Sequence, residues 1–382
     1  MKSANRWHLS CSAMVLILGP LLAGEARADS PFQELTPQSE QALERGLQWL
    51  AKNQEADGNW SSNDMGLVSI GALAFLSAGH TPGKGQYGEN VSKALDYVLR
   101  NAKPSGLLNI AGGHDMYNHG LSCFVLGQAY GMTSDARVGP VLDRALKLIV
   151  KTQCRDGGWD YTAMPQQNGH DLSLAVMQAK ALRSAVDSGL EVPPEVIELA
   201  IRSVRQHYTP QGCAYNAPEE EQKKYPGRFC YSVGGGNATP AMAAAGVVCM
   251  QEFAQYDDWR IEKNMQVLED EIRQKCNDKN TQVPFDAYTL YYIGQAMYQA
   301  GGARWKHNYP LLRDSLVASQ AKSGGVDTYG SWQSGGQVGG KPGQLYQTAV
   351  SCFILAMPNR FLPILQEGKI ESLRKQLQKG KG

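Results

Sequence analysis

Two short tetrads hold the residue types best suited to acid–base or metal chemistry. The sequence reads Gly-Gly-His-Asp over residues 112–115 and Asn-Gly-His-Asp over residues 168–171. An imidazole beside a carboxylate can act as a general acid or base, and the same two groups can ligate a divalent cation. The candidate catalytic residues are therefore His114, Asp115, His170 and Asp171.

Further polar residues stand in related positions and are candidate ligand-binding residues. His119 follows Asp115 by four residues and would share its face on a helix. Asp64 and Asp286 stand at the start of two other predicted helices. Two His-Asp pairs and His119 would supply enough ligands for zinc or another divalent ion. Their spacing matches no known metal motif, so the metal and any cofactor stay unknown.

A structural role explains part of this pattern. An Asp at the start of a helix accepts hydrogen bonds from free backbone N–H groups and suits the helix dipole. Capping would account for the aspartates, but it leaves the two adjacent histidines without an explanation. The structural and the chemical interpretation therefore both stay open.

The elements that would position these residues form a repeat. The frame Gln-x-x-Asp-Gly-x-Trp occurs at residues 54–60 and 153–159. Each copy follows an amphipathic helix and precedes a helix that is poor in charge. Six such helix pairs can be traced along the chain. Their second helices are predicted to begin near Asp64, Asp115, Asp171, Thr239, Asp286 and Gln347.

The two kinds of helix predict an all-α fold, an (α/α)6 toroid of six helical hairpins. Amphipathic first helices suit an outer ring with one face in water, whereas the second helices would be enclosed on all sides. Closure of the ring would pack the helix over 64–79 against residues 346–357. An open solenoid is the alternative, but it needs polar end caps that neither terminal hairpin offers. Inner helices of a toroid run the same way, so both tetrads would lie at one rim of a central cavity.

The sequence resembles a known family in these features. The two Gln-x-x-Asp-Gly-x-Trp frames, the helix-pair period and the C-terminal stretch 330–365 are similar to prenyltransferase/squalene-oxidase (squalene-cyclase-like) repeat proteins. The resemblance covers most of residues 38–366. It implies the α/α toroid of terpenoid cyclases and protein prenyltransferase β subunits. In such frames Gln and Trp tie outer helices together, which implies a structural role for Trp60 and Trp159.

The catalytic motifs of that superfamily are absent from this sequence. It has no Asp-x-Asp-Asp stretch, no Asp-rich diphosphate motif, no Asp/Cys/His zinc set and no Cys-Gly-Glu-Gln thioester. The adjacent pair Asp257 and Asp258 is expected on a solvated face, and the charged run 219–224 is expected in a solvated loop. The fold alone therefore assigns none of these activities.

Three functions are compatible with the sequence. The resemblance favours a protein that holds an isoprenoid-like or other apolar ligand in the cavity, with Tyr117 and Tyr288 among the lining residues. The alternative is a polysaccharide-acting lyase or hydrolase that uses His and Asp at the rim. The third possibility is a scaffold role in the cell envelope, which no feature of the sequence specifically supports. Other aromatic residues expected to line the cavity are Phe124, Tyr291 and Tyr292.

The first 28 residues have the layout of a secretory signal peptide. Lys2 and Arg6 precede an apolar run over residues 13–23, and Ala-Arg-Ala at 26–28 favours cleavage before Asp29. The run is too short for a membrane anchor, which is the alternative interpretation. We therefore expect an exported protein, periplasmic or extracellular, with no transmembrane segment in its mature chain.

The sequence predicts three segments. Residues 1–28 would be the signal peptide, 29–366 the toroid and 367–382 a basic C-terminal tail. The chain has 37 Lys and Arg against 36 Asp and Glu, so no general attraction to nucleic acid is expected. The expected partner is a small-molecule or polymeric ligand in the cavity.

Export makes disulfides possible among the cysteines of the mature chain. Cys213 and Cys230 bracket a loop, and a disulfide between them is the favoured pairing. Cys154 occupies the matching turn one repeat earlier, so Cys154–Cys213 is the alternative. The cysteines expected to be free and buried within apolar helices are Cys123, Cys249 and Cys352.

Overall fold

The computed structural model describes residues 32–366 except 63, 111, 278–281, 326 and 334–342. The expected signal peptide, its cleavage site and the expected basic tail lie outside the described residues, so their assignment stays a prediction. In the described part, no helix is both long and apolar enough to cross a membrane.

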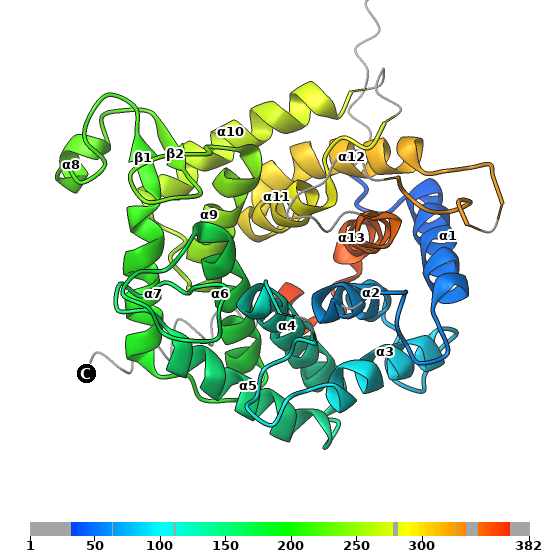
Figure 1. The fold of residues 1–382 in the computed structure, drawn as a ribbon. Coiled ribbons are helices and arrows are strands. Elements are labelled where there is room, and N and C mark those ends of the chain that lie inside the picture. Colours follow the sequence, from blue (N-terminus) through cyan, green and yellow to red (C-terminus); the bar gives the residue numbers. More distant parts are fainter. Residues whose placement is uncertain are drawn as a thin grey trace, which may run out of the picture. The chain divides into compact units, whose positions relative to one another are not determined.

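Six helices form an inner ring (Figure 1). They are α2 (Met65–Ser77), α4 (Asp115–Thr133), α6 (Leu172–Asp187), α9 (Pro240–Glu252), α11 (Ala287–Ala300) and α13 (Gln344–Ala356). Each packs against the next in this order, and α13 packs against α2. The predicted contact between 64–79 and 346–357 is therefore confirmed, and the fold is the predicted all-α toroid rather than an open solenoid.

The remaining long helices pack outside this ring. They are α1 (Pro37–Asn53), α3 (Gly88–Arg100), α5 (Val138–Thr152), α7 (Pro194–Gln206), α10 (Trp259–Lys275) and α12 (Gly302–Ser319). Helix α1 buries Leu43, Leu47 and Leu50 on one face, which is the expected amphipathic pattern. Inner helices are enclosed, and small residues let them approach closely. A Cβ on Gly127 of α4 would lie 2.2 Å from the Oγ of Ser184 in α6.

The Gln-x-x-Asp-Gly-x-Trp frame joins neighbouring outer helices, as the resemblance implies. The Nε2 of Gln153 donates hydrogen bonds of 2.9 Å to the carbonyls of Gly157 and of Val196 in α7. The indole of Trp159 donates to the carbonyl of Ile149 at 2.9 Å. The first frame, at residues 54–60, makes the same set of bonds.

A third version of this frame closes the ring and was not found in the sequence. The Nε2 of Gln320 donates to the carbonyls of Gly330 and of Ala42 in α1, both at 2.8 Å. The indole of Trp332 donates to the carbonyl of Leu316 at 2.8 Å. A longer loop separates this Gln from its Trp, which hid the pattern.

The alternation of inner and outer helices is interrupted between α7 and α9. Strand β1 (Tyr208–Pro210) pairs antiparallel with β2 (Gly227–Phe229), and the one-turn helix α8 (Glu219–Gln222) lies between them. Two 3-10 helices, η1 (Met357–Asn359) and η2 (Pro363–Leu365), follow α13. The two strands form a short antiparallel pair that closes the loop between them.

The predicted disulfide is not formed in the structure. All seven cysteines of the described residues are free thiols, so neither Cys213–Cys230 nor Cys154–Cys213 is present. The Sγ of Cys230 lies 3.5 Å from the carbonyl of Arg228, to which it donates a hydrogen bond. The prediction that Cys123, Cys249 and Cys352 are buried and free is confirmed.

Candidate functional site

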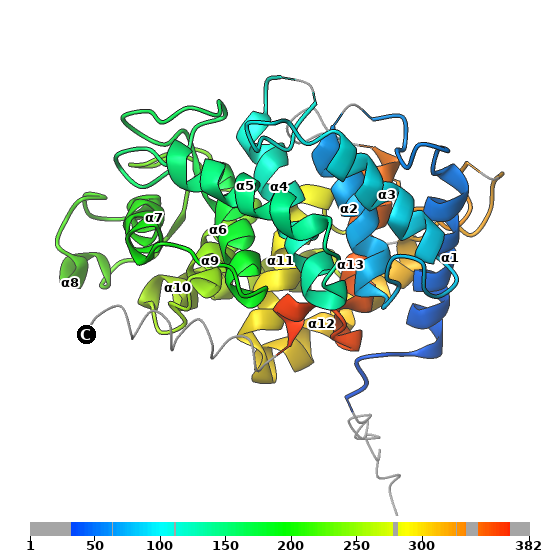
Figure 2. The same ribbon diagram turned by 90° about the horizontal axis from the view of Figure 1, so that it is seen from below.

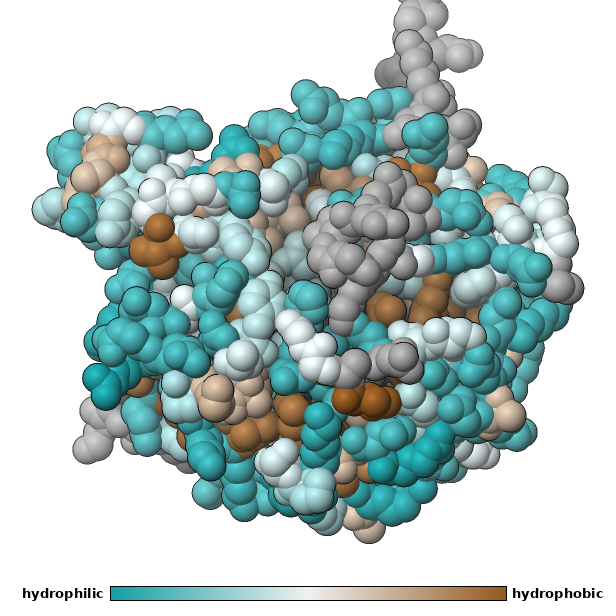
Figure 3. Space-filling model, viewed as in Figure 1, coloured by the Kyte–Doolittle hydropathy of each residue, from teal (hydrophilic) through white to brown (hydrophobic). Residues whose placement is uncertain are grey.

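A cavity of about 490 Å³ opens where the inner helices begin. The loops that lead into α2, α4 and α6 lie on one side of the ring, and η1 and η2 lie on the opposite side (Figure 2). Figure 3 views the face shown in Figure 1, which is mostly hydrophilic around its edge with hydrophobic residues toward its centre. The lining residues used below are Asp64, Leu67, His114, Tyr117, Leu121, Tyr161, Ser173, Tyr231, Met242, Asp286, Tyr288 and Tyr346. Five of them were predicted site residues: Asp64, His114, Tyr117, Asp286 and Tyr288.

Two carboxylates combine capping with a place on the cavity wall. Asp64 precedes α2 and its Oδ1 accepts from the backbone N–H of Gly66 at 3.0 Å. Asp286 precedes α11 and accepts from the backbone N–H and the hydroxyl of Thr289, at 3.1 and 2.7 Å. Helix capping therefore fixes both carboxylates beside the cavity.

Tyrosines form much of the wall. The rings of Tyr117 and Tyr288 lie 6.5 Å apart, and Tyr288 meets Tyr292 edge-on at 4.9 Å. Burial raises the pKa of Tyr117, Tyr288 and Tyr346 well above the usual range, so all three phenols are neutral. Three aromatic residues expected in the lining belong instead to the fully buried core: Phe124, Tyr291 and Tyr292.

His119 does not belong to the site, and its predicted ligand-binding role is wrong. The side chain is fully buried. Its Nδ1 accepts from the backbone N–H of Leu108, and its Nε2 lies 3.0 Å from the carbonyl of Ala145, to which it donates. Burial lowers the pKa of this imidazole to about 4. His119 is a neutral core histidine that ties α4 to α5 and to the preceding loop.

The second tetrad forms a well-ordered pair. Asp171 is the N-cap of α6, and its Oδ1 accepts from the backbone N–H groups of Ser173 and Leu174, at 2.8 and 3.3 Å. Its Oδ2 lies 2.7 Å from the Nδ1 of His170. Because an ionised carboxylate only accepts, Nδ1 carries the proton and Nε2 is left as the basic nitrogen. The Asp171 side chain is fully buried, whereas the His170 side chain is 50% exposed.

The loop that carries this pair is held by the second repeat motif. The backbone N–H of Gly169 donates to both carboxylate oxygens of Asp156, at 3.0 and 2.9 Å. The backbone N–H of His170 donates to the carbonyl of Trp159 at 2.9 Å. A Cβ on Gly169 would lie 2.8 Å from the Cα of Gly158, so only glycine fits there. The structural motif therefore positions the imidazole.

The first tetrad is built differently. Asp115 is the first residue of α4 rather than its cap, and its Oδ1 accepts from the side-chain amide of Asn109 at 2.8 Å. No hydrogen bond joins His114 to Asp115 among the described residues. Gly113 has a φ of +112°, a conformation that glycine adopts readily. The two His-Asp pairs therefore differ, and only His170 and Asp171 contact each other directly.

Tyr161 links the two tetrads. Its ring meets His114 edge-on at 5.2 Å and His170 at 4.9 Å, so the two imidazoles flank one phenol. Its hydroxyl lies 3.0 Å from that of Tyr231. Burial and then the charge of Asp171 raise the pKa of Tyr161. No sequence pattern singled out Tyr161 and Tyr231, although Tyr161 stands two residues after the motif tryptophan.

The donor set does not form a metal site in the described part of the chain. No group of three or more His, Cys, Asp and Glu side chains there could hold a metal ion. The expected cluster of three imidazoles does not form, because His119 lies in the core.

Comparisons with known proteins agree on the fold. No family model matches the chain, and no curated protein matches its sequence. The structure is similar to a variant of a type II terpene cyclase from Scytonema in complex with geranylgeranyl dihydroxybenzoate. That similarity has a TM-score of 0.53 at 14% identity and covers 84% of this chain and 98% of the other.

Two carbohydrate-active proteins are similar to the same extent. A GH76 α-mannanase from Bacteroides thetaiotaomicron matches with a TM-score of 0.55 at 12% identity, covering 83% of this chain and 94% of the other. A sugar epimerase from a ruminal bacterium matches with a TM-score of 0.57 at 11% identity, covering 84% and 98%. At these identities the likeness shows the fold alone. The resemblance to the terpenoid-cyclase toroid is confirmed at that level.

Proposed function

We propose that this protein is an exported α/α toroid that binds a small, mostly apolar, isoprenoid-like molecule in its central cavity. The observation that carries the proposal is the cavity itself, which has about 490 Å³ and an apolar and aromatic wall. Leu67, Leu121 and Met242 face it together with the tyrosines. An apolar pocket with few polar groups is the usual form of a small-molecule site.

The polar groups at the mouth would orient such a ligand. Asp64, Asp286 and His114 line the opening and can hydrogen-bond to a hydroxyl or other polar end group. The similar terpene cyclase is bound to a molecule that carries a geranylgeranyl chain, which supports an elongated apolar ligand. The proposal is binding rather than cyclisation, since the sequence has no Asp-x-Asp-Asp stretch.

A variant that fills the cavity tests the proposal. Leu67→Trp adds volume to the wall, whereas Leu148→Trp alters a half-buried leucine of α5 outside the lining. We expect geranylgeraniol to bind the wild type and Leu148→Trp alike, and Leu67→Trp at least about tenfold more weakly. Calorimetry of the mature protein measures this. Equal affinity in all three folded proteins would reject the cavity as the site.

The His170–Asp171 pair supports a second candidate, an enzyme acting on a polysaccharide. The buried carboxylate of Asp171 orients the imidazole of His170, whose Nε2 could then accept a proton from a substrate hydroxyl or carbon. Incubation of the mature protein with a panel of glycans, followed by detection of new reducing ends, tests for cleavage. Activity that survives His170→Gln would exclude this pair from the reaction.

A further inference from the structure

A second pocket of about 670 Å³ lies beside the outer helix α7, away from the central cavity. The connection over residues 207–239 encloses it together with α7 and the start of α10. This connection carries β1, α8 and β2, which project from the ring of helices in Figure 1. It contributes no helix to either ring.

Specific contacts hold this connection in place. The indole of Trp259 donates to Glu219 at 2.6 Å, and the Nζ of Lys263 donates to the carbonyl of Tyr225 at 2.6 Å. A Cβ on Gly246 of α9 would lie 2.1 Å from the ring of Phe229, so the strand packs directly on the inner helix. The pocket is therefore preformed.

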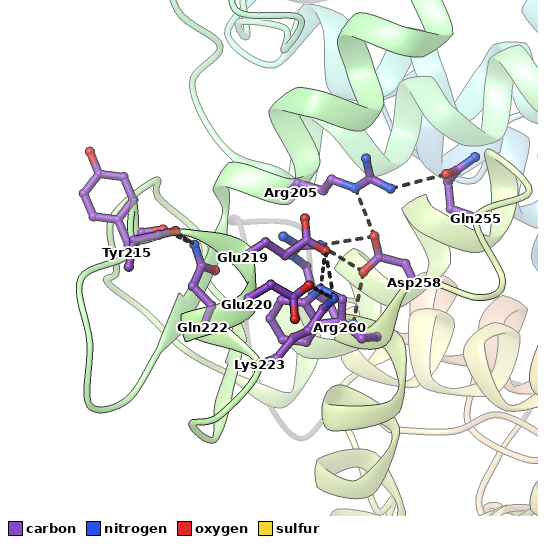
Figure 4. A network of polar contacts seen from close by, with 11 residues as sticks. Arg205, Tyr215, Glu219, Glu220, Gln222, Lys223, Gln255, Asp258 and Arg260 are labelled. Carbon is purple, nitrogen blue, oxygen red and sulfur yellow. Dashed lines mark hydrogen bonds and ion pairs between the residues drawn. The ribbon is translucent and has the colours of Figure 1, made fainter.

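A buried carboxylate organises the base of the pocket (Figure 4). The Oδ2 of Asp258 accepts from the Nε of Arg205 at 2.9 Å, and its Oδ1 accepts from Arg260 at 3.1 Å. The Asp258 side chain is only 3% exposed, so the predicted solvated face is wrong for this residue. The guanidinium of Arg260 also lies over the ring of Trp259 at 4.4 Å. The base thus presents guanidinium groups in fixed positions.

The α7 wall adds two charged groups of opposite sign. Glu198 and Arg202 both line the pocket and are exposed. They are one turn apart, yet neither makes a hydrogen bond or ion pair with any described residue. Arg202 can therefore receive a carboxylate, and Glu198 can accept from hydroxyl groups.

The rest of the lining is amide-rich and partly apolar. Gln206, Gln222 and Gln255 line the pocket, and the Nε2 of Gln222 donates to the carbonyls of Tyr215 and Ala217. Tyr215 and Val233 are 44% and 43% exposed and provide apolar surface at the same pocket. Side-chain amides, a carboxylate that can accept hydrogen bonds from hydroxyl groups, and the exposed ring of Tyr215 suit a ligand that has both hydroxyl groups and C–H surface.

We propose that this pocket binds a carboxylate-bearing saccharide, such as a uronic acid unit of a glycan. The free guanidinium of Arg202 pairs with the carboxylate, and Glu198 accepts from a ring hydroxyl. Phosphate fits less well, because it offers no C–H surface to Tyr215 and Val233. The inference is independent of the ligand in the central cavity.

Calorimetry with a short oligogalacturonate tests the proposal, with a neutral oligoglucoside of equal length for comparison. The variant is Arg202→Gln, and the matched control is Arg144→Gln, an exposed arginine of the outer helix α5. We expect binding of the acidic oligomer alone, weakened at least about tenfold in Arg202→Gln and unchanged in the control. Leu67→Trp, which fills the central cavity, should leave this binding intact.

Three results would overturn the proposal. They are equal binding of the neutral oligomer, an equal loss in both arginine variants, and equal binding of an oligoglutamate of the same charge. The last result would show that charge alone, rather than a saccharide, is recognised. Circular dichroism of each variant confirms that a loss of binding does not reflect unfolding.

Discussion

His170 and Asp171 are adjacent in the sequence, and their side chains form a directed pair in which Asp171 serves two structures at once. One carboxylate oxygen caps α6, and the other lies 2.7 Å from the Nδ1 of His170. The helix cap therefore fixes the direction of the imidazole. In the first tetrad Asp115 follows the cap position, so His114 has no such partner.

Removal of this carboxylate should affect stability in a graded way. Asp171→Ala loses the cap and leaves buried N–H groups without an acceptor, so we expect a loss of about 1–3 kcal/mol in the free energy of unfolding. Asp171→Asn keeps a capping oxygen and should lose less. Urea denaturation of both variants measures the difference. Equal losses would show that capping is not the main contribution.

The buried histidine predicts a pH dependence of stability. Burial lowers the pKa of His119 to about 4 in the folded state. The unfolded imidazole, with a pKa near 6.5, binds more protons between these values, so stability is complete above about pH 6.5 and falls as the pH drops toward 4. A protonated Nδ1 would face the N–H of Leu108, which is the structural cause.

His119→Gln tests this prediction against His307→Gln, an exposed histidine. Between pH 7 and pH 4.5 the first variant should lose less stability than the wild type does, and the second should follow the wild type. Some dependence should persist, because burial also lowers the pKa of His207. An unchanged pH profile in folded His119→Gln would contradict the assignment.

The turn glycine of the second motif should be irreplaceable. Gly157 has a φ of +93°, and a Cβ there would lie 2.1 Å from the carbonyl of Leu199 in α7. We expect Gly157→Ala to lower the free energy of unfolding by at least about 2 kcal/mol. A Cβ on Gly112 meets nothing within 4 Å, so Gly112→Ala is the control and should change stability little. Similar midpoints of denaturation for the two variants would refute this explanation.

The thiols should all be free in the folded protein. Peptide mapping without reductant should recover Cys213 and Cys230 as unlinked peptides, in line with the structure. A linked pair would restore the disulfide expected from the sequence. The most stringent test uses protein isolated from an oxidising compartment, where disulfides can form.

Export can be tested independently of the fold. The intact mass of protein recovered outside the cytoplasm should correspond to a chain that begins at Asp29, because the motif before it suits signal peptidase. Retention of residues 1–28 in the recovered protein would remove the basis for export.

The sequence by itself determined the hairpins and the residues at which most inner helices begin. Capping and periodicity are local, so Asp64, Thr239 and Asp286 could be recognised as the residues that precede α2, α9 and α11. Helix α13 begins at Gln344, whereas the sequence predicted a start near Gln347. No capping side chain marks this helix start, so no local signal in the sequence indicated its position. Closure of the ring followed from the absence of terminal caps.

Only the tertiary structure decided which of the polar residues meet. Helical spacing correctly put His119 on the same face of α4 as Asp115. At His119, however, this face packs against α5 and a loop, and both ring nitrogens form hydrogen bonds with backbone groups there. Tyr161 and Tyr231 come together across 70 residues through the packing of two loops, which no local pattern encodes. Asp258 is buried for the same reason, since its arginine partners come from both α7 and α10.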